Sequence, residues 1–176
     1  MARKAKTSIH PFTLRAVYLH DSQIRMSDGF DPMIPGQPLA AQFRQVGGRI
    51  SCQELTPKDG SGKTLRSCVF IPHFDFRYFR KSDKEIPESE VGNEAEVVAE
   101  LSADIAVDYI VNLPENPPED LLAKWGSSNV LLHAWPYWRE FCHSTLSRMN
   151  LPVTLMPLID LQPAGKSVAS KKRGTK

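Results

Sequence analysis

A chain of 176 residues, with 41% hydrophobic and 24% charged residues, has the length and composition of one globular domain with a sizeable core. No window approaches about 18 consecutive apolar residues, and no apolar segment follows the basic first residues, which argues against a membrane span and a secretory signal. We therefore expect a cytoplasmic protein.

The net charge of +2 is spread unevenly along the chain. Lysine and arginine gather at both ends, whereas all 20 acidic residues lie between Asp21 and Asp160. The pattern predicts a disordered basic arm over residues 1–11, a single domain over residues 12–162 and a disordered basic tail over residues 163–176. Such tails either touch nucleic acid or another anionic surface or remain solvated, and the second alternative is the more common one.

Four segments alternate between apolar and polar side chains and predict strands. They cover residues 12–26, 39–57, 65–81 and 97–112. Gly47 and Gly48 interrupt the second segment, where we expect a break or a bulge. Pro72 cannot donate to a strand ladder, so it indicates either a bulge in the third strand or an edge position for it.

The pattern changes to a helical period after the fourth strand. A short helix is predicted over residues 118–125, with Gly126 as its cap, and a long helix over residues 127–150, which Pro136 should start or kink. Residues 151–163 are expected to be extended, as a last short strand or a strap across the helix. Strands followed by helices predict an α+β fold, with the helices on one side of an antiparallel sheet.

Three widely spaced cysteines, Cys52, Cys68 and Cys142, form no C-x-x-C pair, so no zinc site is expected. An odd count in a reducing compartment predicts free thiols. Cys142 is followed by His143, but neighbouring helix residues face different directions, so these two cannot form a catalytic dyad. The expected role of Cys142 is that of a buried structural thiol.

The sequence shows no established catalytic pattern. It lacks a phosphate-binding loop, a nucleophile elbow and metal-ligand spacing among its histidines. Asp104 and Asp108 share one face of the fourth strand, and two carboxylates on a polar face are ordinarily solvated. The sequence thus predicts a binding protein rather than an enzyme, with no cofactor and no metal ion.

Aromatic side chains are the better candidates for function, as the lining of a groove that holds extended apolar segments. The candidates are Phe70, Phe74, Phe76, Tyr78, Trp135, Tyr137 and Trp138. Taken singly, each is more commonly a core residue. As a set they favour a groove, because a small sheet buries only one face per layer, and Pro136 between two of the tryptophans should direct those rings to different partners.

Three stretches of the chain resemble the SecB family of export chaperones. "PYWRE" from Pro136, followed by Ser147-Arg148 and Pro152, resembles the C-terminal signature of that family. "LRAVYLHDSQI", with Tyr18 and Asp21, is similar to its first strand, and "VGNEAEVVAELSADIAV" is similar to a later strand.

The resemblance implies a four-stranded antiparallel sheet with two C-terminal helices packed on one face and a homotetramer built as a dimer of dimers. It also implies an ATP-independent chaperone that holds unfolded preproteins and passes them to the SecA motor. Asp21 matches an acid that docks SecA, but Arg25 and Asn93 replace two other acids. Like charge disfavours docking of a basic partner, so two alternatives remain: a SecB-like chaperone of a toxin–antitoxin pair, and a basic-tailed interaction protein that binds nucleic acid.

Overall fold

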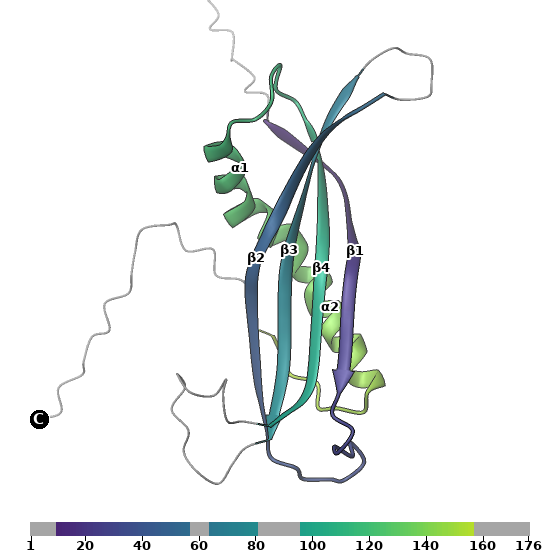
Figure 1. The fold of residues 1–176 in the computed structure, drawn as a ribbon. Helices are drawn as coiled ribbons and strands as arrows, with labels where there is room; N and C mark the ends of the chain where they lie inside the picture. The colour runs from purple at the N-terminus through teal and green to yellow at the C-terminus, as the bar shows by residue number, and fades with distance from the viewer. Residues whose placement is uncertain (1–9, 57–63, 81–95, 157–176) are drawn as a thin grey trace, which may run out of the picture.

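The computed structural model describes residues 10–56, 64–80 and 96–156, and shows one antiparallel sheet with a helical run behind it (Figure 1). The strands are β1 (Phe12–Met26), β2 (Leu39–Leu55), β3 (Leu65–Arg80) and β4 (Val97–Val111). Their order across the sheet is β1-β4-β3-β2. The four predicted strands and the α+β class are confirmed, whereas the predicted tail over residues 163–176 and most of the arm over residues 1–11 lie outside the described residues.

The helical run is continuous from Glu119 to Arg148. It consists of α1 (Glu119–Trp125), a π-helical turn η1 (Gly126–Val130) and α2 (Leu131–Arg148). Gly126 is the C-cap residue of α1, as predicted, but its φ of −60° and ψ of −44° are right-handed helical, so the helical run continues through it. Of the two alternatives for Pro136, a start of the long helix is excluded, because this residue lies inside α2, and a kink of the helix stays a prediction.

Period-two alternation places the apolar side chains of β3 and β4 on the sheet face that the helical run covers. Trp138 of α2 stacks on Phe74 of β3, with ring centroids 5.5 Å apart, and is fully buried. Tyr109 of β4 packs edge-on against Phe70 and Phe12. Each large apolar side chain that is buried in this layer contributes about 1.5–3 kcal/mol to the free energy of unfolding.

A bulge in β2 faces Pro72 of β3. The register of the β2–β3 pair shifts between Gln45 and Gly48. Gly47 has a φ of +67°, which favours glycine, and a Cβ on Gly48 would lie 3.0 Å from the Ile71 carbonyl oxygen. Pro72 is therefore accommodated by the bulge and not by an edge position, because β3 lies inside the sheet.

The segment after α2 is a strap, as one of the two sequence alternatives proposed. Residues Leu151–Met156 form no strand, and the Tyr78 hydroxyl donates to the Pro152 carbonyl oxygen at 2.5 Å. Tyr78 also bonds to the hydroxyl of Thr154. The remainder of the predicted extended segment, residues 157–163, lies outside the described residues.

The prediction of three free thiols is wrong for two of them. Cys52 of β2 and Cys68 of β3 are directly opposite each other in the ladder and form a disulfide. Their spacing of 16 residues carries no pairing signal, because only the register of the hairpin brings the two Cα atoms to 4.1 Å. Cys142 is free and buried, as expected.

Candidate functional site

An apolar groove lies between the bulged part of β2 and the helical run. Its volume is about 280 Å³. We call it the β2 groove. Its lining comes from Gln45, Gly47, Gly48, Arg49 and Ile50 of β2, from Phe70, Ile71 and Pro72 of β3, and from Leu122, Ala123, Gly126, Ser127, Val130 and Leu131 of the helical run.

The groove is hollow because small residues face it from both sides. Gly47 and Gly48 supply no side chain from β2, and the bulge bends this strand locally. On the helical side, a Cβ on Gly126 would lie 3.7 Å from the Phe70 ring, so glycine lets the π-helical turn approach β3 closely. Ala123 adds a single methyl group. Phe70 and Val130 are thus left as a buried apolar floor.

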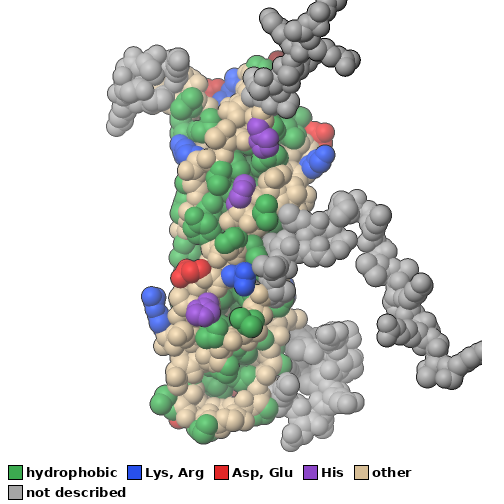
Figure 2. Space-filling model, turned by 180° about the vertical axis from the view of Figure 1, so that it is seen from behind, with side chains coloured by type: hydrophobic (Ala, Val, Ile, Leu, Met, Phe, Trp, Pro, Cys, Tyr) green, Lys and Arg blue, Asp and Glu red, His purple; other side chains and the backbone are tan. Residues whose placement is uncertain are grey.

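Exposed apolar side chains extend from the groove along β2. Ile50 is 46% exposed and Phe43 is 39% exposed. The ring of Phe43 packs edge-on against Trp135 of α2, with centroids 6.3 Å apart. Figure 2 shows that hydrophobic side chains also reach the surface elsewhere on the helix-bearing side of the molecule. This surface is suited to extended apolar segments, because an unfolded chain can bury its exposed apolar side chains against it.

The seven predicted groove residues do not share one surface. Those that are buried in the core between sheet and helices are Phe70, Phe74, Phe76, Tyr78 and Trp138. Within that set only Phe70 contacts the β2 groove, as its floor. Trp135 is partly buried beside Phe43, and Tyr137 is 47% exposed. Most of the seven aromatic residues are therefore core residues in this chain. A client-binding role for the set stays a prediction.

The opposite face of the sheet carries paired charges. Asp108 of β4 is only 2% exposed, which corrects the expectation of a solvated carboxylate. It accepts hydrogen bonds from Arg15 of β1, at 2.9 Å from Nε, and from the Ser67 hydroxyl at 2.6 Å. The pairing offsets the cost of burying this charge and ties the edge strand β1 to the interior of the sheet.

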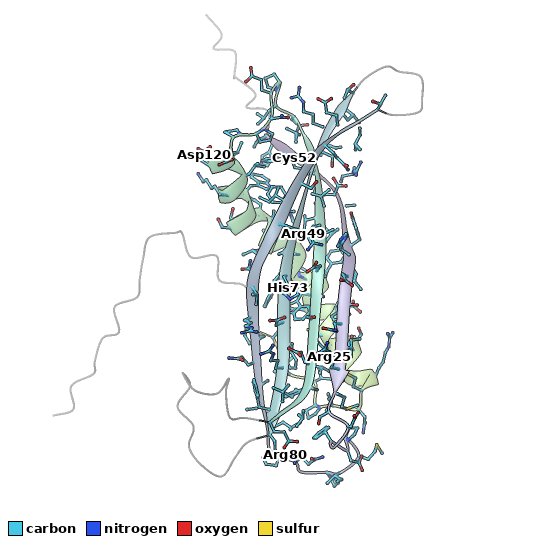
Figure 3. All side chains as sticks on the ribbon, in the orientation of Figure 1. Arg25, Arg49, Cys52, His73, Arg80 and Asp120 are labelled. Carbon is cyan, nitrogen blue, oxygen red and sulfur yellow. A yellow bond between two sulfur atoms is a disulfide. The ribbon has the colours of Figure 1, made fainter. Side chains whose placement is uncertain are left out.

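A second cluster centres on His73 of β3, in the middle of this face (Figure 3). His73 Nδ1 lies 2.6 Å from Asp104, and its Nε2 lies 3.0 Å from Asp75. Arg49 and Arg44 of β2 donate to these same carboxylates at 2.8 Å and 2.9 Å. Asp104 is 8% exposed, which also corrects the expectation that it is solvated.

The cluster shifts the protonation of its members in opposite directions. The hydrogen bond to Asp104, aided by the charge of Asp75, raises the pKa of His73 above its ordinary value. Burial opposes ionisation of Asp104, but hydrogen bonds from His73 and Arg49 outweigh it and hold the pKa of Asp104 below its ordinary value. The cluster is thus a set of charges that neutralise one another.

The predicted motor-docking acid Asp21 is exposed on β1, opposite Asp104. It accepts a hydrogen bond from the Ser22 backbone N–H at 2.8 Å. Arg25, also on β1, lies opposite Glu100, and Asn93 lies outside the described residues. Arginines of β1, β2 and β3 pair with the acids Asp108, Asp75, Asp104 and Glu100 on this face. Because these charges are neutralised, they do little to strengthen the attraction of Asp21 for a basic partner.

The sequence reasoning missed both the β2 groove and the paired charges. Gly47, Gly48 and Pro72 signalled the bulge, but not that a groove would lie between it and the helical run. The arginine–aspartate pairs join residues of different strands that are 31, 55 and 93 positions apart, and the sheet register brings them together. Among the described residues, no group of three or more His, Cys, Asp and Glu side chains could hold a metal ion. No helix in the described part of the chain is long and apolar enough to cross a membrane.

No family model and no curated protein matches the sequence. A solved structure does match: the Mycobacterium tuberculosis Rv1957 SecB-like chaperone in complex with a ChAD peptide from the Rv1956 HigA1 antitoxin. The TM-score is 0.62 and the sequence identity is 16%, over 87% of this chain and 93% of that one. The similarity at this low identity is one of fold, and it spans nearly all of both chains. The chain therefore has the fold of the SecB-like chaperones.

Proposed function

We propose that this protein is an ATP-independent chaperone that holds unfolded or partly folded polypeptides in the β2 groove. The observation that carries the proposal is the groove itself. It combines a buried apolar floor, Phe70 and Val130, with the exposed strand β2, which lies at the edge of the sheet in the described part of the chain. An extended client chain can bury apolar side chains there and bond to the backbone of β2.

The proposed client class is an antitoxin-like polypeptide, and not a preprotein destined for the SecA motor. Two observations support this choice. The SecB-like chaperone of similar fold is bound to an antitoxin peptide. The sheet face that carries Asp21 has its other described acids paired with arginines, so it is a poor match for a basic motor segment. Titration with the basic C-terminal peptide of SecA should give no saturable binding at physiological salt.

We further propose that the protein assembles through β1 into a homotetramer, in the cytoplasm as the sequence predicts. Four apolar side chains of β1 lie opposite inward-facing residues of β4, yet the helical run leaves them 38–49% exposed: Leu14, Leu19, Ile24 and Met26. A second copy would cover this row, since an exposed apolar row on a long edge strand is ordinarily protected by another element.

The chaperone proposal is tested by the aggregation of a heat-unfolded protein such as citrate synthase, followed by light scattering without nucleotide. The wild type should suppress aggregation, and Ala123→Glu should suppress it much less. Ala123 is exposed and lines the groove, so glutamate places a charge at the apolar mouth without disturbing the core.

The matched control is Leu132→Glu, which introduces the same charge at a helix position that is 50% exposed and does not line the groove. It should behave like the wild type. Suppression that depends on added ATP, or an equal loss of suppression in both variants, would contradict a nucleotide-independent chaperone that acts through this groove.

A further inference from the structure

The Cys52–Cys68 disulfide joins the edge strand β2 to β3 beside the β2 groove. Figure 3 shows Cys52 toward the end of the sheet, beyond Arg49 along β2. On the helix-facing side of the ladder, the pair Ile50–Phe70 lines the groove, and Cys52–Cys68 is the next pair on that side. The disulfide is therefore one step from the groove wall.

Besides the disulfide, this part of β2 is held by its ladder with β3 and by the ion pairs Arg49–Asp104 and Glu54–Arg66. In each ion pair one side chain is more than half exposed, and such surface pairs hold a strand only weakly. The segment Gly48–Leu55 begins at the bulge, where Pro72 has no N–H to donate to the ladder, and ends at Leu55. The segment is exposed along nearly its whole length, and no strand among the described residues lies on its outer side. A covalent bond near the middle of such a segment limits its motion against β3.

The disulfide can exchange with a dithiol from solution. Cys52 is exposed, whereas Cys68 is fully buried, and a cavity of about 180 Å³ adjoins the pair. An incoming thiolate attacks Cys52 Sγ, the S–S bond breaks and the Cys68 sulfur leaves and takes up a proton. The second thiol of the reductant then displaces Cys52, so that two electrons and two protons pass to the protein and the reductant becomes a disulfide.

The third cysteine does not interfere with this exchange. Cys142 is buried on α2, and burial strongly raises the pKa of its thiol, so that it remains protonated. The exchange is thus confined to Cys52 and Cys68.

We infer that the Cys52–Cys68 pair is a redox control of the β2 groove, an inference that rests on the proposed function. In the oxidised protein, the disulfide holds Arg49 and Ile50 in the geometry that binds a client. In the reduced protein, the end of β2 is free to move and the groove wall must be ordered anew when a client binds. Binding is therefore tighter in the oxidised form, because preorganisation lowers the entropy cost of association.

The test measures binding of a fluorescently labelled polypeptide by the full-length protein, with and without dithiothreitol. A suitable probe is reduced, S-carboxymethylated α-lactalbumin, which is permanently unfolded and has no thiol or disulfide of its own. The dissociation constant of the wild type should rise about tenfold on reduction. Cys52→Ser should bind like the reduced wild type in both buffers, and Cys142→Ala should retain the full redox response.

The outcomes separate the two claims. Equal binding by the oxidised and reduced wild type, or a redox response that persists in Cys52→Ser, overturns the redox control alone. Absence of binding in both buffers overturns the proposed function, and this inference with it. Circular dichroism of the reduced wild type, which differs from the oxidised form only in this bond, shows whether the fold is retained if the serine variant is unstable.

Discussion

Trp135 and Trp138 are separated by Pro136 on α2, and the structure predicts different consequences when each is truncated. Trp138 is fully buried in the core, with 0% of its surface exposed to solvent, and it stacks on Phe74 and Phe141. Trp135 is only partly buried and contacts Phe43 and Phe74 edge-on. The first ring thus supports the core, and the second also faces the apolar surface along β2.

Removal of a buried tryptophan typically costs about 3–5 kcal/mol. The indole Nε1 of Trp138 has no hydrogen-bond partner among the described residues. Its removal relieves the folded state of a buried, unpaired N–H, which offsets part of the loss of stability. We therefore expect Trp138→Ala to lower the free energy of unfolding by about 3 kcal/mol, out of a total of about 5–15 kcal/mol. Trp135→Ala should lower it by about 1 kcal/mol and chiefly weaken client binding.

Urea unfolding followed by circular dichroism at several protein concentrations measures the first effect, and titration with the unfolded probe measures the second. Trp138→Phe is the matched variant, because it keeps an aromatic stack and removes the unpartnered N–H. It should cost about 1 kcal/mol. Equal losses of stability in the two alanine variants, with unchanged binding per folded molecule, would refute the division of roles and place both rings in the core.

Three further predictions follow from the bulge, the His73 cluster and the exposed row on β1. Gly48→Ala should lower the free energy of unfolding by about 1–3 kcal/mol, because its Cβ would crowd the β3 backbone. The control is Gly29→Ala, whose Cβ would meet nothing within 4 Å and which should change this free energy by less than about 0.5 kcal/mol. Similar values for both variants in urea unfolding would contradict the close approach of Gly48 to β3. Because the pKa of His73 is raised in the folded protein, the stabilisation by its charge is fully present below the ordinary pKa of about 6.5 and is lost as the pH rises through the pKa of the folded state. The wild type should therefore be more stable than His73→Gln at low pH, and this difference in the free energy of unfolding should shrink as the pH rises above about 6.5. A difference that stays constant with pH would exclude the pairing. Light scattering at micromolar concentration should give a tetramer, which Leu19→Lys should weaken, and a wild-type particle of 19.8 kDa would rule out the proposed assembly.

Local pattern was sufficient for the elements of the sheet. The alternation over residues 12–26 matches β1 at both ends, and the apolar side chains of the alternating fourth segment lie on the face of β4 that the helical run covers. Period two decides these strands because side chains on one face must meet the same environment at every second residue. Pro72 and Gly47–Gly48 likewise marked the bulge, since the missing N–H and the left-handed φ are properties of those residues themselves.

Tertiary structure decided the features on which function depends. The sequence predicts a solvated carboxylate for Asp108, but β1 brings Arg15 to it. It predicts a free thiol for Cys52, but the β2–β3 register places this residue opposite Cys68. Gly126 reads as a helix cap, yet it keeps a helical conformation and lets the π-helical turn rest on the Phe70 ring. Each case depends on a partner in another element of the fold. A local pattern describes only one segment, and the sheet register and the helix packing decide which segment lies against it.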